Sequence, residues 1–323
     1  MARSEELDVQ AGEVALACTL TLPEERPPAD RGGRYPNVLL LPSWLPRDRH
    51  GNWDRDGHPG WYAPGLAGNG LLARVADALA TRGVASLRCD PRGCGCSGGA
   101  WESVSLFTRI DDARDMLAAM RSHGALDLRR TGVVGHGEGA TIGLAVAVGD
   151  PAVGALTLIG PPARSWRDVL RRGVAARARH GTDREHPIVA ALDRWSEDLI
   201  ERAQRREPAF EIPLPGGELV RLELAGVEQA IHTPGRALAS MLHRSVTLVH
   251  GADDRWSHPD ESALLADALA EAGEQRNRRI VPAAAHDLAE ASDTTIGELA
   301  DDLAARLLPR DLPPVLVAIE GMG

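Results

Sequence analysis

The sequence contains no lysine, so all 36 residues counted as lysine or arginine are arginine. Without a lysine amine no Schiff base can form, which excludes pyridoxal-phosphate and aldolase-type imine chemistry. The formal net charge is −10, and the chain has no long basic run. Nucleic acid and anionic membrane surfaces are therefore not expected as partners.

Long apolar runs are also absent. No stretch approaches the roughly 18 consecutive apolar residues that a membrane-spanning helix needs. The polar and acidic segment Met1–Gln10 has no positively charged start followed by an apolar stretch. We therefore expect no secretory signal and a cytoplasmic location.

Cysteine is scarce, with four residues at Cys18, Cys89, Cys94 and Cys96. The Cys94-x-Cys96 pair lacks the two-residue spacer of a redox or zinc motif, and no second pair completes a tetrahedral site. We therefore expect four free thiols in a reducing compartment.

One acidic segment, 52–57, has the Asn-x-Asp-x-Asp-Gly spacing with which a calcium-binding loop begins. Its twelfth position is Ala63, where such a loop needs glutamate, so chelation would be incomplete. His50 and His58 in the same region are weak candidates for metal ligands. We expect a polar surface loop here, and neither a metal site nor a cofactor.

Short apolar runs alternate with segments of helical spacing along most of the chain. This alternation predicts an α/β fold with a mostly parallel, doubly wound sheet that is covered on both faces. Thr108 and Asp111 have the spacing of a capping box at the start of the second helix. The predicted strands are 13–22, 37–41, 84–89, 131–135, 155–159, 246–250 and 279–282, and the predicted helices are 71–81, 109–120, 140–148, 260–272 and 296–308.

An arginine-rich block interrupts the alternation, so we divide the chain into a core, 1–160 and 241–323, and an inserted cap, 161–240. The tail from Pro309 is expected to be a loosely held extension. Within the cap we predict helices at 166–179 and 188–206 and a hairpin at 210–224 around Pro215-Gly216-Gly217.

A glycine-rich turn, Gly135-His136-Gly137-Glu138-Gly139, lies between a predicted strand and a predicted helix. This is the context of the nucleophile elbow G-x-S-x-G, whose flanking glycines permit a tight turn, but here the central residue is glycine. Asp254 follows a later predicted strand, and His286 follows the next one. Asp253 competes for the acid position, and the spacing from Gly251 favours Asp254.

With this order of elbow, acid and histidine, the chain resembles the α/β-hydrolase superfamily over nearly its whole length. It is most similar to the bacterial serine aminopeptidases and small esterases. Two further segments carry the resemblance. The segment 41–52 resembles the family's oxyanion loop, and Asp-Pro-Arg-Gly-Cys-Gly-Cys-Ser-Gly-Gly at 90–99 resembles its Asp-x-Arg-Gly-x-Gly-x-Ser turn.

The resemblance implies a role for each site residue. Gly137 stands at the nucleophile position, Asp254 is the acid and His286 is the base. The backbone N–H groups of Glu138 and Trp44 form the implied oxyanion hole. The chain departs from the family at the missing serine and in the oxyanion loop, where Pro42 and Trp44 replace the usual glycines.

Gly137 has no oxygen with which to attack a carbonyl, so no covalent ester can form there. His286, with its tautomer fixed by Asp254, remains competent as a general base near neutral pH. We therefore expect a lyase-type elimination in which His286 removes a proton from a substrate carbon. Relatives with this fold imply one version, the loss of acetate in tetronate polyketide pathways.

Four alternatives stay open. His286 could activate water for hydrolysis, or the nucleophile could have moved to Ser43, Cys94 or Cys96. Gly137 could be an engineered replacement for a serine. The chain could also be an inactive relative that binds a ligand or partner.

Tryptophan outnumbers the other aromatic residues, with seven against two phenylalanines and two tyrosines. Several tryptophans follow predicted strands or lie near the motifs, where they would rim the site of this fold; covering the edge of the core is an equally good explanation. The expected ligand is a small, largely apolar molecule in an aromatic pocket. We expect Ser43, Trp44, His136 and Trp256 to contact it, and Trp53, Trp61 and Trp101 to lie at the rim.

Overall fold

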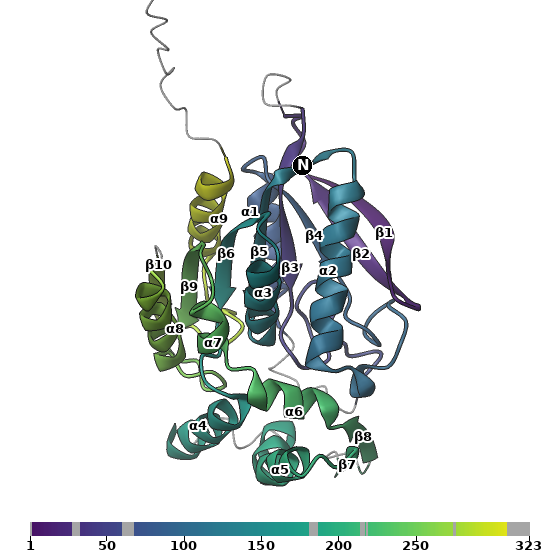
Figure 1. Cartoon of the computed structure of the whole chain (residues 1–323), viewed down its shortest axis with the longest axis vertical. Helices are drawn as coiled ribbons and strands as arrows, with labels where there is room; N and C mark the ends of the chain where they lie inside the picture. The colour runs from purple at the N-terminus through teal and green to yellow at the C-terminus, as the bar shows by residue number, and fades with distance from the viewer. Residues whose placement is uncertain are drawn as a thin grey trace, which may run out of the picture.

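The computed structural model describes residues 2–27, 33–59, 68–180, 187–213, 217, 219–273 and 276–308, with the backbone alone at 177–180, 187–192 and 276. Its centre is one eight-stranded sheet in the order β1-β2-β4-β3-β5-β6-β9-β10 (Figure 1). The pairs β1–β2 and β2–β4 are antiparallel, and the other neighbouring pairs are parallel. The strands are Arg3–Ala11 (β1), Val14–Leu22 (β2), Tyr35–Leu41 (β3), Ala85–Cys89 (β4), Leu126–His136 (β5), Val153–Ile159 (β6), Ser245–Gly251 (β9) and Arg276–Val281 (β10).

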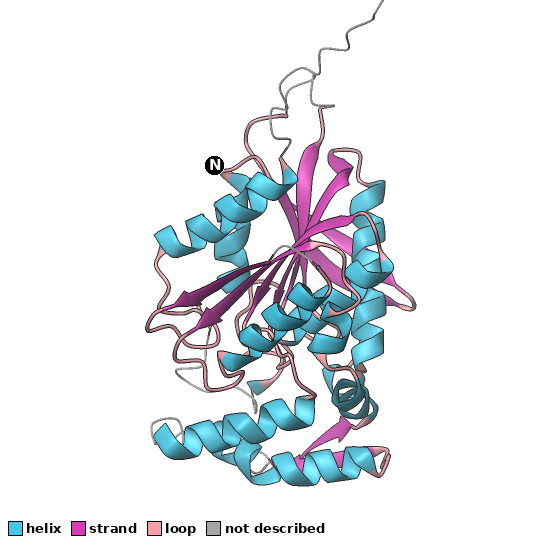
Figure 2. Ribbon diagram, turned by 60° about the vertical axis from the view of Figure 1, so that its left-hand side comes forward, coloured by secondary structure: helices cyan, strands magenta, loops and turns pink. Residues whose placement is uncertain are grey.

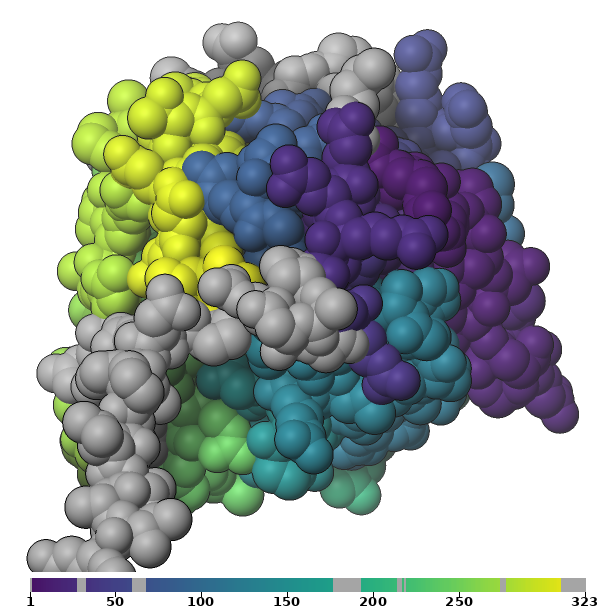
Figure 3. Space-filling model, turned by 90° about the horizontal axis from the view of Figure 1, so that it is seen from above, coloured from purple at the N-terminus to yellow at the C-terminus, as the bar shows by residue number. Residues whose placement is uncertain are grey.

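Helices cover both faces of this sheet, which confirms the predicted α/β-hydrolase architecture (Figure 2). Viewed from the end away from α4 and α5, helix α9 (yellow) lies beside α1 (blue) on one face (Figure 3). The other face is covered by α2, α3 and α8, which share a second buried cluster. The covering helices are Leu71–Ala80 (α1), Leu106–Ser122 (α2), Glu138–Gly149 (α3), Asp260–Glu271 (α8) and Asp293–Leu307 (α9).

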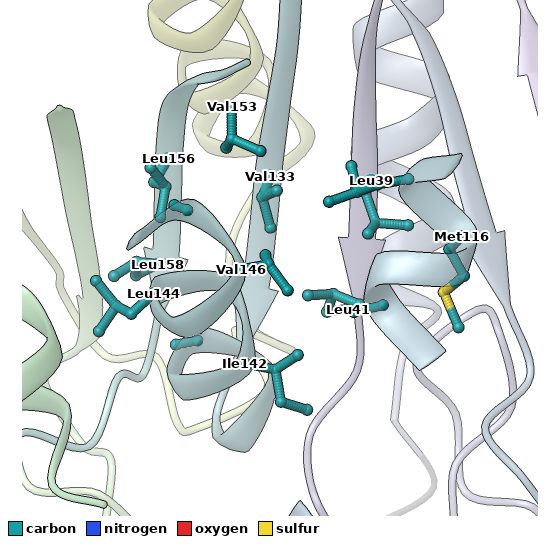
Figure 4. Packing of buried hydrophobic residues seen from close by; sticks show 14 of the residues in the cluster. Leu39, Leu41, Met116, Val133, Ile142, Leu144, Val146, Val153, Leu156 and Leu158 are labelled. Atoms are coloured by element: carbon teal, nitrogen blue, oxygen red, sulfur yellow. The ribbon is translucent and has the colours of Figure 1, made fainter. Parts of the chain in front are cut away.

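Strand β3 shows why the sequence forms a sheet buried on both sides. All seven of its residues are buried. Successive side chains of a strand point to opposite faces, so Leu39 and Leu41 join the cluster under α2 and α3 (Figure 4), whereas Val38 and Leu40 join the cluster under α1 and α9. Each such leucine contributes about 1.5–3 kcal/mol on burial. The packing fixes the carboxyl ends of the central strands, where the site residues follow.

The block between β6 and β9 lies at those carboxyl ends, as the downward strand arrows show in Figure 1. Its two long helices and its hairpin follow the sequence prediction closely, although the turn residues Pro215 and Gly216 lie outside the described residues. Two short helices were not predicted. The elements are Trp166–His180 (α4), Pro187–Gln204 (α5), Ala209–Pro213 (β7), Leu219–Glu223 (β8), Ala225–His232 (α6) and Gly235–Ala239 (α7).

Two local features differ from the sequence predictions. The polar start of the chain forms the edge strand β1, in which only Val9 and Ala11 are buried. These two residues and Leu7 alternate along the strand and pack into the core, and the remaining side chains are polar. Helix α2 begins at Leu106, because the Ser105 hydroxyl accepts the backbone N–H of Thr108 at 3.0 Å. The predicted cap at Thr108 was therefore one turn too late.

The expectation of four free thiols was wrong for two of them. Cys18 on β2 and Cys89 on β4 form a disulfide, with their Cα atoms 4.0 Å apart. The two cysteines are 71 residues apart in sequence but are direct partners in the antiparallel register of β2 and β4. Disulfides persist in oxidising environments, so this pairing does not support the expected reducing compartment.

Two further expectations concern the termini and the membrane. Among the described residues, no helix combines the length and apolar character that a membrane crossing requires. The tail from Pro309 lies outside the described residues.

Candidate active site at the carboxyl ends of the strands

Three strand ends bring Gly137, Asp254 and His286 together. Gly137 follows β5, Asp254 follows β9, and His286 follows β10. Gly137 has φ 56° and ψ −118° and is followed directly by helix α3. A positive φ is unfavourable for residues with a side chain, so the backbone here has the sharp strand-to-helix geometry of the elbow.

Asp254 is held by four donors. Its Oδ2 atom accepts a hydrogen bond from Nδ1 of His286 at 2.7 Å, and its Oδ1 atom accepts the backbone N–H groups of Trp256 and Ser257, each at 2.9 Å. Nε2 of the fully buried His250 lies 3.1 Å from Oδ2. Asp253 is exposed, so the geometry favours Asp254 as the partner of His286.

This pairing changes the pKa of both groups. Burial alone would raise the pKa of the Asp254 carboxyl, but the charge of His286 and the hydrogen bonds from both histidines outweigh it and lower the pKa well below its ordinary value. Burial alone would lower the pKa of His286, but the Asp254 carboxylate outweighs it and raises the pKa above 6.5. The pair therefore consists of a firmly ionised carboxylate and an imidazole of increased basicity.

The other ring nitrogen of His286 faces the elbow. A Cβ atom placed on Gly137 would lie 3.1 Å from Nε2 of His286. The same Cβ would lie 2.2 Å from Oγ and 2.9 Å from Cβ of Ser43. The Ser43 hydroxyl therefore takes the space in which a side chain of residue 137 would begin, next to the base. The sequence indicated Ser43 as a candidate for a displaced nucleophile and for a substrate contact. Its position beside Gly137 depends on how the loop after β3 packs on the elbow.

The predicted oxyanion-hole residues border the same cavity. Trp44 and Glu138 line it together with Gly137, Gly160 and His286. Glu138 is the first residue of α3, and N–H groups in a helix's first turn have no partner within that helix. Its side chain forms an ion pair with Arg109.

Four tryptophans line the cavity. The predicted Trp44, Trp53 and Trp256 line it, and so does Trp166 at the start of α4, which the sequence analysis did not single out. The rings of Trp44 and Trp166 meet edge to face, with centroids 4.5 Å apart. Trp101 packs behind Trp44, with centroids 5.5 Å apart. Trp61 lies outside the described residues.

His136 does not line the cavity, although the sequence placed it among the substrate contacts. Its side chain is 1% exposed, and Nε2 lies 3.1 Å from the backbone oxygen of His286. Burial lowers the pKa of His136 to about 3, so the ring is neutral. The structure thus places it as a support beneath His286.

An ion pair that sequence reasoning missed lies next to His286, and both of its members line the cavity. Arg47 donates two hydrogen bonds to the Asp287 carboxylate, each at 3.1 Å, and a third to the backbone oxygen of Gly51 at 2.8 Å. Burial alone would raise the pKa of Asp287, but Arg47 outweighs it and lowers the pKa. Asp287 is also 3.4 Å from Nε2 of His136. Arg47 and Asp287 are 240 residues apart, so no local motif reveals the pair.

Comparison with known proteins identifies the family of this fold. The sequence profile of the alpha/beta hydrolase fold matches residues 62–291. The chain belongs to the alpha/beta hydrolase family. No curated protein matches its sequence.

Solved structures share the fold over almost the whole chain. Est1E from Butyrivibrio proteoclasticus, bound to ferulic acid, is 14% identical with a TM-score of 0.64, covering 93% of this chain and 98% of that one. DcsB in complex with its substrate analogue is 13% identical with a TM-score of 0.65, covering 94% and 99%. Proline iminopeptidase from Mycobacterium smegmatis is 16% identical with a TM-score of 0.61, covering 94% and 99%. Identities this low establish the fold alone.

Proposed function

We propose that this alpha/beta hydrolase is an enzyme of the lyase type, in which His286, oriented by Asp254, removes a proton from a substrate carbon. The observation that carries the proposal is the orientation of His286. Its Nδ1 atom is engaged by Asp254 at 2.7 Å, while its Nε2 atom faces Gly137, which has no oxygen to deprotonate. A base that keeps its orienting acid but lacks a nucleophile at the elbow is suited to proton abstraction.

The step we propose is a β-elimination of a carboxylate, with acetate as the leaving group. Nε2 of His286 takes the proton from the carbon next to a carbonyl, and that electron pair forms a carbon–carbon double bond. The bond between the β-carbon and the acetate oxygen breaks, and acetate leaves with its electron pair. The proton on His286 then passes to acetate or solvent. The backbone N–H groups of Trp44 and Glu138 would stabilise the enolate oxygen that develops in between.

The walls of the cavity support an apolar substrate. Trp44, Trp53, Trp166 and Trp256 line the cavity around His286, and aromatic rings of this kind bury large apolar groups. The structural relative Est1E binds ferulic acid, and we propose a small, largely apolar ligand for this chain as well. An acetylated intermediate of tetronate polyketide assembly is the concrete candidate.

We also propose that residues 161–240 act as the cap that selects this substrate. Pro162, Trp166, Val169 and Leu170 of this block line the same cavity as His286. Exchange of these four side chains should therefore change the preferred substrate more than the rate of the chemical step.

The test is to incubate the full-length protein with β-acetoxy carbonyl compounds that carry apolar chains, in water enriched in heavy oxygen. Elimination gives an unsaturated product and acetate without solvent oxygen. Hydrolysis of the ester gives the hydroxy compound, heavier than the alkene by one water, and acetate that contains solvent oxygen. Turnover should be lost in His286→Ala and kept in the control His123→Ala, whose histidine lies at the far end of α2.

Two outcomes of this test would count against elimination. Solvent oxygen in the acetate would show hydrolysis. Ligand binding without turnover, and without sensitivity to His286→Ala, would show a binding protein.

A second function, ester hydrolysis with Ser43 as a displaced nucleophile, is favoured by one observation. The Ser43 hydroxyl and Nε2 of His286 lie around the same point, 2.2 Å and 3.1 Å from where a Cβ of residue 137 would be. A hydroxyl activated by this base would react with a fluorophosphonate probe. The elimination proposal predicts no labelling, whereas stoichiometric labelling that disappears in Ser43→Ala would establish Ser43 as an activated nucleophile and favour hydrolysis.

A further inference from the structure

A second group of chemically active side chains lies outside the cavity of His286. Asp54 and His58 belong to the loop between β3 and α1, and Cys94 belongs to the loop after β4. One ligand atom from each lies within 4.8 Å of the other two. The group is enclosed: Cys94 is 1% exposed, Asp54 is buried, and the His58 side chain is 9% exposed. We propose that Asp54, His58 and Cys94 bind a zinc ion that joins these two loops.

The donor set selects the metal. A thiolate, an imidazole and a carboxylate together offer sulfur, nitrogen and oxygen ligands, which is the set that zinc uses in proteins. Calcium and magnesium prefer oxygen ligands alone, so the sulfur of Cys94 and the nitrogen of His58 argue against both. A Cys–His–Asp site also leaves one of the four zinc positions for a further ligand.

Two of the three ligands are already oriented. The Asp54 carboxylate accepts the backbone N–H groups of Gly57 at 3.1 Å and Gly95 at 2.9 Å, which fixes its direction. Nδ1 of His58 lies 3.6 Å from the carboxylate of Glu102. A carboxylate behind the far nitrogen is the usual partner of a zinc-bound histidine, because it sets the ring's tautomer and orientation. This leaves Nε2 of His58 to face Asp54.

The distances require only a small closure. Bonds of 2.0–2.3 Å in a tetrahedron place neighbouring ligand atoms about 3.3–3.8 Å apart. Nε2 of His58 is 3.8 Å from Oδ2 of Asp54, and the widest separation within the set is under 4.8 Å. Because the Asp54 carboxylate is fixed, rotation of the Cys94 side chain and a small shift of the His58 ring must supply the remaining closure of about 1 Å.

The Gly93 backbone oxygen is the candidate for the fourth position. It lies 2.7 Å from Nε2 of His58, so without a metal the ring donates a hydrogen bond to it. Zinc would replace that proton on Nε2 and draw the same oxygen, or a water molecule, into its coordination sphere. The competing explanation is that this hydrogen bond alone joins the two loops and that no metal binds. Metal analysis and the cobalt titration distinguish the two explanations.

The position of the site gives the metal a structural role. The rings of His58 and Trp101 meet at a steep angle, with centroids 5.9 Å apart. The Trp101 ring nitrogen donates to the backbone oxygen of Trp44 at 3.1 Å, and Trp44 lines the cavity of His286. Asp54, His58 and Cys94 do not line that cavity. Zinc at this place would therefore brace its tryptophan wall without touching the substrate.

This proposal departs from the sequence expectation of no metal site. A ligand pair four residues apart, followed by a cysteine 36 positions after the histidine, matches no familiar zinc spacing. Only the fold brings the loops together. The nearby Cys96, which shares the Cys-x-Cys motif, is exposed and is not part of the group.

The experiment uses the full-length protein, purified without chelators and analysed for metal. The protein is then stripped with a chelator and titrated with Co²⁺, because a thiolate bound to cobalt gives a near-ultraviolet charge-transfer band. We expect close to one zinc per chain and a strong band at saturation. The matched pair is Cys94→Ala, which should lose the band and the zinc, and Cys96→Ala, which should keep both.

Glu102→Gln keeps the test decisive if Cys94→Ala fails to fold. Glu102 supports His58 without binding the metal, and loss of such a partner weakens metal affinity by about 10–100-fold. The proposal is overturned if the folded wild-type protein gives no thiolate–cobalt band. It is equally overturned if Cys94→Ala binds Co²⁺ as tightly as Cys96→Ala does.

Discussion

The position of Ser43 makes a sharp prediction about restoring a serine to the elbow. In Gly137→Ser the new Cβ would meet Oγ of Ser43 at 2.2 Å and its Cβ at 2.9 Å, closer than carbon and oxygen atoms can approach without movement. Overpacking of this kind costs about 1–3 kcal/mol. The φ of 56° at residue 137 adds about 1–3 kcal/mol for a residue with a side chain. The single variant should therefore lose about 2–6 kcal/mol of unfolding free energy.

The exchange of both residues should behave differently. Ser43→Gly removes the atoms that the new side chain would meet, so the double variant Ser43→Gly/Gly137→Ser should regain about 1–3 kcal/mol relative to Gly137→Ser. The Cβ atom of the new serine would lie 3.1 Å from Nε2 of His286, so its hydroxyl would be within reach of the base. Base assistance of this kind is worth roughly 10²–10⁴-fold in rate.

Two measurements check this prediction. Urea unfolding compares the stability of wild type, Ser43→Gly, Gly137→Ser and the double variant. Fluorophosphonate labelling and cleavage of a chromogenic acetate ester compare their reactivity, with His286→Ala added to the double variant as the control. If Gly137→Ser is as stable and as reactive as the double variant, Ser43 does not occupy this space. If the double variant folds but stays unlabelled, His286 is not aimed at residue 137.

The remaining predictions concern the base, its support and the cap. His286→Ala should lower kcat/KM by an amount equivalent to about 3–6 kcal/mol, and Asp254→Asn should cost less because the imidazole can still act in a poorer tautomer. His286 acts as a base only when its imidazole is neutral, and its pKa is raised above 6.5. The value of kcat/KM should therefore fall with decreasing pH, with a midpoint above pH 6.5. A midpoint below pH 6.5 would contradict the ion pair with Asp254. Arg47→Met should lower the free energy of unfolding, measured in urea at neutral pH, by about 3 kcal/mol, because it leaves the Asp287 carboxylate without its arginine partner. This loss of stability should shrink as pH falls below 3.8, where the carboxylate, whose pKa is lowered in the folded protein, becomes protonated and no longer contributes. Trp166→Ala should raise KM for apolar substrates and leave kcat within a few-fold, whereas an equal fall in kcat would place Trp166 in the chemistry.

Much of the fold could be predicted because its signals are local. The buried runs at 37–41, 131–135 and 155–159 are too apolar for an exposed segment, and the glycines at 135, 137 and 139 mark the tight turn that follows β5. The edge strand β1 could not be predicted in the same way. Its apolar face is short, with only Leu7, Val9 and Ala11 packing into the core, and the rest of the strand is polar and pairs with β2 through its backbone.

The site was predictable only in outline. Chain order and spacing identified Asp254 and His286, and in the structure Oδ2 of Asp254 lies 2.7 Å from Nδ1 of His286. Contacts between distant segments were not visible. Sequence alone cannot show that Arg47 meets Asp287, that Cys18 faces Cys89 across two strands, or that a hydroxyl from the β3 loop fills the space at the elbow, because each depends on the register and packing of elements far apart in the chain.

The energetics of the buried polar groups favour a working base over a relic. Burying a carboxylate such as Asp254, which is 2% exposed, carries a desolvation penalty that hydrogen bonds only partly offset, and an apolar replacement of similar volume is often no less stable. Asp254 receives four donors, and Arg47, which is 4% exposed, and the partly exposed Asp287 form a second ion pair beside the same histidine, at the wall of the cavity. A protein that merely bound an apolar ligand would need neither. Together they hold one imidazole with its free nitrogen toward Gly137, which is the arrangement that proton abstraction requires.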